Sequence, residues 1–399
     1  MKKIEIMGCG YIGLPTAVTF TLAGYEVCGF DINEAVVDTL NSGHIHIVEP
    51  GLQEAMTEAL ATGRLHFSAK PEPADVFIIA VQTPYKVEGG KKVSEMKYVW
   101  SAAESVSTVA KPGDLCVLES TSPPGSTREV ERIVAEGAGM KPEQFMTAHC
   151  PERIIPGRML IELRENDRII GSNRPEAAEY AKEVYSKVVT KGTIRTTDDL
   201  TAEMCKLVEN TFRDINIAYA NELSKVCDRL GIDVFKLIAL ANCHPRVNVH
   251  TPGVGVGGHC IAVDPWFLHE KFEDITPLIY TARTINDGKP AWTADRIAKD
   301  VQPGAKIAVL GLSFKANIDD IRESPSIEFA NILKERGYEV IACEPFRDGP
   351  VAGFDNHTLE EAIAKCDYAV ITLAHTPFVE NKALIATKPY YDCVGLMEQ

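Results

Sequence analysis

The stretch from Lys3 to Pro15 reads KIEIMGCGYIGLP, and it decides the fold of the first part of the chain. KIEIM is a short apolar run that predicts a β-strand, and the glycines of GCGYIG end that strand. Helical sequence follows from about Leu14 to Ala23, and Gly24 suits the C-terminal end of a helix. A second strand, in YEVCGFD, ends at Asp31. This order of strand, glycine turn, helix and strand predicts a parallel, doubly wound sheet.

The glycine turn fits G-x-G-x-x-G, with Gly8, Gly10 and Gly13 in the required places. The first glycine permits a tight turn, the second lets a pyrophosphate approach the backbone, and the third lets helix and strand pack closely. Asp31 follows Gly13 by 18 residues, where a carboxylate can accept both ribose hydroxyls and would repel a 2′-phosphate. A plain glycine-rich turn is the alternative, but the flanking strand and helix favour a dinucleotide site, and Asp31 favours NAD over NADP.

The rest of the chain repeats this alternation. Further strands are expected at Val76–Val81, Leu115–Leu118 and Phe145–Ala148, and a second α/β pattern begins after VQPG at 301–304. The second pattern has GLSFKA where the first has GCGYIG, so we expect only the first to bind the dinucleotide. The loops QTP and STSPPGST follow two of the strands, and there Thr83 and Thr121 are candidate ligand contacts, with ordinary turns as the alternative.

A long helix is predicted from Asp198 or Asp199 to Leu230, since this stretch has no Gly or Pro. Its apolar residues at helical spacing predict either a spine between domains or a dimer contact; they include Met204, Val208, Ile215 and Ala218. The expected architecture is two Rossmann-like doubly wound parallel-sheet domains joined by a long central helix and a helical middle domain. The expected boundaries are 1–196, 197–300 and 301–399.

Composition narrows the class of protein. A net charge of −15 argues against non-specific binding to nucleic acid or membranes, which a basic patch would favour. The N-terminus lacks the features of a signal peptide, and no long apolar run could span a membrane, so a cytoplasmic enzyme is expected. The 11 cysteines include no C-x-x-C pair, so no metal site is expected.

One cysteine stands out among them. TPGVGVGGHCIAVDPWFL, at 251–268, places Cys260 after a run of glycines, beside His259 and four residues before Asp264. We interpret the glycines as removing bulk so that a substrate can reach the loop backbone. A cysteine is not needed to remove one hydride from an alcohol. It is needed when an aldehyde must be oxidised further, because a thiolate adduct of the aldehyde can lose a second hydride.

Several motifs together resemble the nucleotide-sugar 6-dehydrogenases, and the resemblance covers essentially the whole chain. They are GCGYIGLP, QTP, STSPPGST, CPER at 150–153, K-x-x-x-N at 206–210, GVGGHC-x-x-x-D at 255–264 and FK…RES at 314–324. The segment HPRVNVHTPGVGVGGHCIAVDPWFL is most similar to UDP-N-acetyl-D-mannosamine dehydrogenases. The UDP-glucose enzymes typically have Ser in the place of His259. This resemblance implies a four-electron oxidation of the sugar C6 hydroxyl to a carboxylate with two NAD, for surface polysaccharide synthesis.

The resemblance also implies roles for individual residues. Cys260 is the implied nucleophile, Lys206 stabilises the oxyanions, Asn210 positions the same oxygen, and Asp264 and Glu152 order or activate water. The implied cofactor contacts are Gly8, Gly10, Tyr11, Ile12, Gly13, Asp31, Thr83, Thr121 and Arg322. The implied UDP-sugar contacts are Arg153, Ile154, Lys206, Asn210, Arg213, His244, Arg246, Gly257, Phe314 and Lys315. Val36 is a departure from the family pattern, because relatives often carry a basic residue there for the adenosine ribose; it bears on the tightness of NAD binding and not on the identity of the cofactor.

Three alternatives remain open from the sequence. The substrate could be UDP-GlcNAc or UDP-glucose instead of UDP-N-acetyl-D-mannosamine. A single-hydride dehydrogenase of the β-hydroxyacid type would also join a Rossmann domain to helices, but it leaves Cys260 without a role. A non-catalytic NAD-sensing protein leaves the GGHC-x-x-x-D segment unexplained. A homodimer is expected from the apolar stripe of the long helix.

Overall fold

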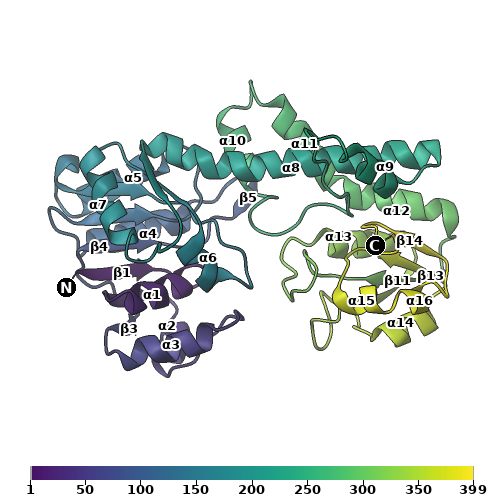
Figure 1. Cartoon of the computed structure of the whole chain (residues 1–399), viewed down its shortest axis with the longest axis horizontal. Helices are drawn as coiled ribbons and strands as arrows, with labels where there is room; N and C mark the ends of the chain where they lie inside the picture. The colour runs from purple at the N-terminus through teal and green to yellow at the C-terminus, as the bar shows by residue number, and fades with distance from the viewer. Residues whose placement is uncertain (1, 399) are drawn as a thin grey trace. The chain divides into compact units, whose positions relative to one another are not determined.

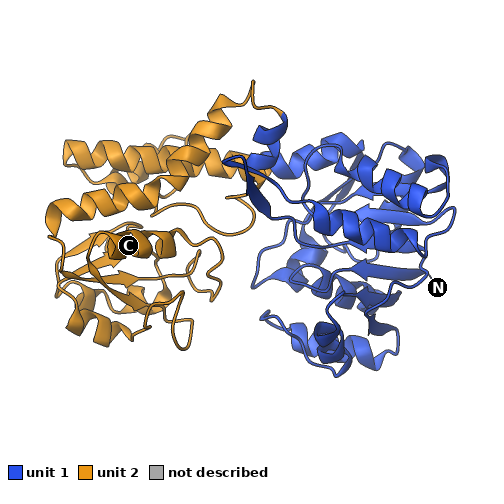
Figure 2. Ribbon diagram, turned by 180° about the vertical axis from the view of Figure 1, so that it is seen from behind, with its two compact units in different colours: residues 1–208, 266–271 blue, residues 209–265, 272–399 orange. Residues whose placement is uncertain are grey.

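The computed structural model describes residues 2–398 and contains two parallel-type sheets, each with helices on both faces (Figure 1). By contacts the chain divides into two units, which Figure 2 colours separately. Unit 1 is residues up to 208 with 266–271, and unit 2 is residues 209–265 with those from 272 onward. The long helix α8 (Asp199–Leu230) crosses this division and begins and ends where the sequence predicts.

The sheet of unit 1 has the order β10-β9-β8-β7-β4-β1-β2-β3. Six neighbouring strands, β8 to β3 in that order, are parallel, while β9 pairs with β8 in the antiparallel sense, a reversal that the sequence did not indicate. The strands are β1 (Lys3–Met7), β2 (Glu26–Phe30), β3 (Leu65–Ser68), β4 (Val76–Ile79), β7 (Leu115–Leu118), β8 (Met146–His149), β9 (Arg168–Gly171) and β10 (Ile194–Thr197).

Two apolar cores lie on opposite faces of this sheet. One packs the sheet against α1 (Gly13–Leu22), α3 (Leu52–Ala61) and α7 (Pro175–Tyr185), and the other against α4 (Lys97–Ser107) and α5 (Ser126–Gly137). The remaining elements of unit 1 are α2 (Glu34–Asn41), α6 (Met159–Glu165), the short 3-10 helix Pro142–Gln144 and the hairpin β5 (Tyr85–Glu88) and β6 (Lys91–Ser94). Burial on both faces explains why the central strands β4 and β7 consist of apolar residues only.

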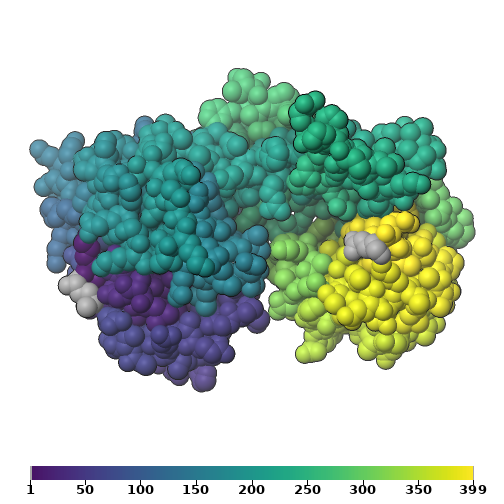
Figure 3. All heavy atoms as spheres, viewed as in Figure 1, coloured from purple at the N-terminus to yellow at the C-terminus, as the bar shows by residue number. Residues whose placement is uncertain are grey.

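Unit 2 contains a second, four-stranded parallel sheet with the order β12-β11-β13-β14. Its strands are β11 (Lys306–Leu310), β12 (Glu339–Cys343), β13 (Tyr368–Ile371) and β14 (Tyr390–Asp392), and its helices are α13 (Pro325–Glu335), α14 (Leu359–Lys365), α15 (Thr376–Glu380) and α16 (Lys382–Ile385). Figure 3 shows the C-terminal residues, in yellow, packed into one continuous body. The second Rossmann-like domain expected from the sequence is therefore present.

In chain order, several helices come between the strands of the first sheet and those of the second, and apart from α8 they are short. They are α9 (Val234–Ala241), α10 (Asp264–Lys271), α11 (Pro277–Asp287) and α12 (Lys289–Asp300). Among residues 2–398, no helix combines the length and the apolar character that crossing a membrane requires.

Candidate active site

The glycine turn between β1 and α1 has the geometry of a dinucleotide loop. Gly8 has φ +99°, and a Cβ on it would lie 2.9 Å from Val81. A Cβ on Gly13 would lie 1.8 Å from the Gly8 carbonyl oxygen, so only glycine lets the helix approach the strand. At Gly10, by contrast, nothing lies within 4 Å of the position of a Cβ. The residues therefore fit the cofactor, because a pyrophosphate has open space where it must meet the backbone.

Asp31 lies beside this loop, at the end of β2. Its Oδ2 accepts a hydrogen bond from the Cys9 amide at 3.0 Å, and its Oδ1 accepts one from the Asn33 amide at 3.0 Å. These two amides fix the direction of a half-buried carboxylate at the edge of the sheet where the parallel strands end. Asp31 is thus oriented to accept ribose hydroxyls.

The other predicted cofactor residues lie at the same edge. Thr83 follows β4 and Thr121 follows β7, and these strands lie beside β1 in the sheet. The Ser120 hydroxyl joins the two loops by donating to the Val81 carbonyl at 2.7 Å. Tyr11 is exposed and Ile12 is half-buried at the start of α1. Val36, on α2, packs against the apolar core.

Glu152 follows β8 and is buried beside a cation that no sequence motif indicates. Arg168, on β9 and 1% exposed, places its Nη1 2.6 Å from Glu152 Oε2 and 3.8 Å from Glu119 Oε1. The Arg153 amide donates to Glu152 Oε1 at 2.6 Å. Burial and the nearby charge of Glu152 raise the pKa of Glu119 to about 7. Arg168 therefore balances two buried carboxyl groups, and no local pattern could reveal it because its partners are distant in sequence.

Glu203 fixes helix α8 to the STSPPGST loop, and no motif in the sequence indicates this residue. The Glu203 carboxylate accepts hydrogen bonds from the Gly125 amide at 2.6 Å and from the Thr127 amide and hydroxyl at 2.7 and 2.6 Å. Burial raises the pKa of this carboxyl group. Lys206 lies nearly one turn further along α8 and is half-buried. The predicted oxyanion stabiliser is therefore carried by a helix whose position is fixed by the candidate cofactor loop.

In unit 2, Cys260 lies in the helical turn just before α10. The amides of Val263 and Asp264 donate to the Cys260 carbonyl at 3.0 and 2.9 Å, and the Cys260 residue is exposed. Asp264 is 3% exposed, and its Oδ2 accepts a hydrogen bond from the Asn210 side-chain amide at 2.5 Å. The structure therefore brings a reachable thiol within one turn of a buried carboxylate–amide pair.

Comparison with known proteins agrees with this arrangement. Sequence profiles of the UDP-glucose/GDP-mannose dehydrogenase family match residues 2–189 (NAD binding domain), 200–288 (central domain) and 308–399 (UDP binding domain). The chain belongs to the UDP-glucose/GDP-mannose dehydrogenase family. Its cofactor is accordingly NAD, as the glycine loop and Asp31 predict.

Individual relatives within the family are similar over almost their full length. The chain is 46% identical to the NDP-N-acetyl-D-galactosaminuronic acid dehydrogenase of Ralstonia nicotianae, over 94% of this chain and 92% of that one. It is 45% identical to the UDP-N-acetyl-D-mannosamine dehydrogenase of Escherichia coli K12, over 94% of each. A solved structure of UDP-D-ManNAc dehydrogenase from Pyrococcus horikoshii matches with a TM-score of 0.91 at 39% identity, covering 99% of this chain and 96% of that one.

The glycines before Cys260 pack closely against another segment of unit 2. A Cβ on Gly257 would lie 2.5 Å from the Glu323 carbonyl oxygen and 2.9 Å from Phe314 Cβ. At Gly258, with φ +82°, a Cβ would lie 2.8 Å from the Phe314 ring. These glycines therefore have a packing role, and their contact with the substrate stays a prediction. The absence of side chains lets the cysteine loop pack against the 314–325 segment of the C-terminal domain.

That segment carries several predicted substrate contacts. Lys315 is exposed, Phe314 is half-buried, and exposed Arg322 pairs with Asp320 at 2.6 Å. Burial, followed by the charge of Arg322, lowers the pKa of His259, so this ring is neutral at neutral pH. Packing of the two loops thus brings Arg322 electrostatically close to the residue that precedes Cys260.

The remaining residues predicted to contact the UDP-sugar lie in three separate segments. His244 and Arg246 are exposed in a loop that Asn242 closes by exchanging hydrogen bonds with the Val249 backbone. Arg213 is exposed on α8, nearly one turn beyond Asn210. Arg153 and Ile154 are half-buried in unit 1, just after Glu152.

Proposed function

We propose that the protein oxidises the C6 hydroxyl of UDP-N-acetyl-D-mannosamine to a carboxylate, using two NAD and one water per sugar. The observation that carries this proposal is the exposed Cys260 one helical turn before the buried Asn210–Asp264 pair. Support for the sugar comes from relatives named UDP-N-acetyl-D-mannosamine dehydrogenase at 43–45% identity and from solved structures of that name at 38–39% identity.

NAD, when bound, accepts the hydride that leaves C6 in each oxidation. In the first stage Lys206 stabilises the alkoxide that forms as the C6 hydroxyl loses its proton, and Asn210 positions that oxygen. The Cys260 thiolate then adds to the C6 aldehyde carbon, forming a C–S bond and an oxyanion that Lys206 again stabilises. Loss of the second hydride leaves a thioester.

Hydrolysis completes the reaction. Asp264 and Glu152 are the carboxylates proposed to order or activate the attacking water, which releases the sugar acid and returns the Cys260 thiol. Asp264 has supporting geometry within unit 2, because the Cys260 carbonyl accepts a hydrogen bond from the Asp264 amide. Its hydrogen bond from Asn210 fixes the carboxylate orientation. Glu152 is held by Arg168 and by the Arg153 amide, so its carboxylate is also fixed.

We further propose the same substrate and cofactor contacts that the sequence predicts. A UDP-sugar carries two negative charges, so an acidic protein needs local cations to bind it. Arginine suits phosphate because its guanidinium donates two parallel hydrogen bonds. The cations proposed for this role are Arg153, Arg213, Arg246, Lys315 and Arg322. Residues 1–196 would bind NAD, 197–300 would supply the catalytic Lys and Cys, and 301–399 would bind UDP.

The second candidate substrate is the corresponding N-acetylgalactosamine nucleotide. It is favoured by one observation, the 46% identity to a relative named NDP-N-acetyl-D-galactosaminuronic acid dehydrogenase. UDP-GlcNAc and UDP-glucose remain the further alternatives from the sequence. The four UDP-sugars, each incubated with saturating NAD, should be compared by initial rate of NADH formation. The proposal requires the highest kcat/KM with UDP-N-acetyl-D-mannosamine, and a higher value with any of the other three would replace it.

A homodimer is part of the proposal. Phe212, Tyr219 and Val226 follow one another at seven-residue spacing on α8, which places them on one face of the helix. They are 62%, 52% and 48% exposed. A row of large exposed apolar side chains on a long helix is typical of a helix-to-helix interface. Sedimentation should give twice 43.7 kDa, and Phe212→Asp should give the monomer. A wild-type monomer would contradict the proposed dimer.

Cytoplasmic location and a role in surface polysaccharide synthesis also remain predictions.

A further inference from the structure

A row of polar side chains crosses three adjacent strands of unit 1. Glu5 on β1 is the register partner of Cys28 on β2, and Cys28 is the register partner of His66 on β3. Register partners in a parallel sheet point to the same face. The residues on either side of this row point to the other face and belong to the apolar core, as Ile6 and Phe67 do. Polar residues in this place are unusual, because the strands of a parallel sheet normally have apolar residues on both faces.

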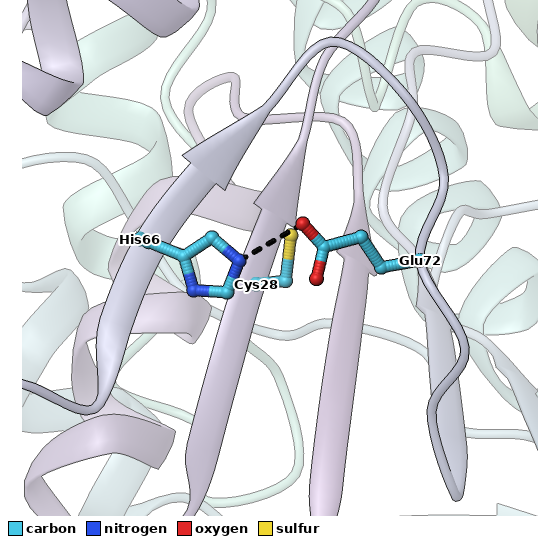
Figure 4. Close-up of side chains that lie close together, drawn as sticks. All are labelled: Cys28, His66 and Glu72. Atoms are coloured by element: carbon cyan, nitrogen blue, oxygen red, sulfur yellow. Dashed lines mark hydrogen bonds and ion pairs between the residues drawn. The ribbon is translucent and has the colours of Figure 1, made fainter.

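Glu72 lies over this row, in the 69–75 segment between β3 and β4 (Figure 4). The Cys28 sulfur, a His66 ring nitrogen and a Glu72 carboxylate oxygen all lie within 4.8 Å of one another. His66 Nε2 and Glu72 Oε1 are 3.1 Å apart. Zinc bonds of about 2.0–2.3 Å in a tetrahedral site separate ligand atoms by roughly 3.3–3.8 Å. The three groups could therefore bind one zinc ion after only small movements.

Glu5 gives an independent indication of a missing cation. Its residue is 0% exposed, and its Oε1 accepts a hydrogen bond from the Glu72 amide at 2.6 Å. Its Oε2 is buried without a hydrogen-bond partner. A buried carboxylate oxygen without a donor is unfavourable, and a metal ion would supply the missing interaction.

The charges of the cluster also balance with a divalent ion present. The Cys28 thiolate, Glu5 and Glu72 would carry three negative charges, and Zn²⁺ with the Lys3 ammonium would carry three positive ones. Lys3 Nζ lies 2.7 Å from Glu72 Oε2, which leaves Oε1 facing His66. A ligating carboxylate whose second oxygen is bound by an outer cation is a usual arrangement around metals.

We propose that Cys28, His66 and Glu72 form a structural zinc site, with Glu5 as a further carboxyl group beside it. The mixed thiolate, imidazole and carboxylate set favours Zn²⁺ over Mg²⁺ or Ca²⁺, which prefer oxygen ligands only. The ion would join the edge strand β3 and the 69–75 segment to β2. The sequence predicts no metal, because the ligands come from two strands and a loop and show no metal-binding spacing.

The test uses Co²⁺ as a spectroscopic substitute for zinc, in full-length protein carrying Cys243→Ser and Cys260→Ala. These changes remove the two exposed cysteines, which could bind cobalt on their own. The proposal predicts one equivalent of bound Co²⁺ with a thiolate-to-cobalt charge-transfer band, displaced by one equivalent of Zn²⁺. Adding Cys28→Ser should remove the band. The matched control is Cys116→Ala, a fully buried cysteine on β7, which should keep the band.

His66→Gln and Glu72→Gln keep the proposal testable if the Cys28 variant misfolds. Their side chains are only partly buried, at 45% and 31% exposed, so these two variants should fold. Each should weaken Co²⁺ and Zn²⁺ binding at least about 10-fold while the far-UV circular dichroism stays unchanged. Absence of the band in the parent protein would overturn the proposal. So would a band that survives both Cys28→Ser and His66→Gln.

Discussion

Asn210 and Asp264 form a buried pair in which the amide Nδ2 donates to Oδ2 across 2.5 Å. Each residue is less than a tenth exposed, and Asp264 begins the helix that follows Cys260. The pair fixes a carboxylate close to the proposed nucleophile, so its proposed role in thioester hydrolysis can be tested separately from the oxidation steps.

Asp264→Asn removes the carboxylate and keeps an oxygen for the Asn210 amide. We expect kcat to fall by about 10²–10⁴-fold, the range for loss of a general base. Intact-protein mass spectrometry should then detect a nucleotide-sugar acyl group on Cys260, because hydrolysis becomes the slow step. Asp274→Asn, at an exposed position in the same part of the chain, is the control and should keep wild-type turnover. Wild-type turnover in Asp264→Asn would exclude Asp264 as the water-activating group.

Arg168→Met should destabilise the protein strongly, because it leaves Glu152 and Glu119 buried without their cation. Breaking a buried ion pair on one side costs about 3–5 kcal/mol of unfolding free energy. Urea denaturation measures this loss. Arg132→Met breaks an exposed pair of ion contacts on α5 and should cost far less. Equal losses in the two variants would contradict the role given to Arg168.

Asp31→Ala should weaken NAD binding, because it removes the proposed acceptor of the ribose hydroxyls. Hydrogen bonds to a charged group contribute about 1.5–3 kcal/mol, which corresponds to roughly a 10- to 100-fold rise in the dissociation constant. Calorimetric titration with NAD measures this dissociation constant. The control is Asp38→Ala, which changes an exposed residue on α2. Discrimination against NADP should also decrease. Unchanged NAD affinity would show that Asp31 serves only the loop amides.

His149 should make stability depend on pH. Full burial lowers the pKa of this ring from 6.5 to about 3. Between these values the unfolded chain binds the proton and the folded chain does not, so stability rises with pH across this window and levels off above about 6.5. The slope is at most about 1.4 kcal/mol per pH unit. The free energy of unfolding of wild type, minus that of His149→Met, should therefore rise from pH 5 to pH 6.5. A difference independent of pH would mean that His149 can be protonated in the folded state.

The parts of the fold that the sequence predicts well are those with local causes. The turn at Gly8–Gly13 and helix α8 follow from glycine spacing and from the absence of breaking residues. The strand expected at Val76–Val81 ends two residues early, at Ile79. The antiparallel strand β9 was missed because strand direction depends on the connection, not on the residues within the strand.

The parts that could not be predicted depend on partners far apart in the chain. Glu203 binds the loop at Gly125–Thr127, and nothing in either segment indicates the other. The packing of the glycines before Cys260 against Phe314 and Pro325 could not be predicted either, because those residues lie more than 50 positions further along the chain. Residues that carry out the chemistry can be recognised in the sequence, whereas the residues that pack against them can be identified only in the folded structure.

The covalent role of Cys260 is the central claim, and the stoichiometry of NADH tests it most directly. Limiting UDP-N-acetyl-D-mannosamine should be consumed to completion in excess NAD, first with wild type and then with Cys260→Ala. The account predicts two NADH per sugar with wild type and no more than one with the variant. One NADH per sugar with wild type, or two at the wild-type rate with Cys260→Ala, would contradict it.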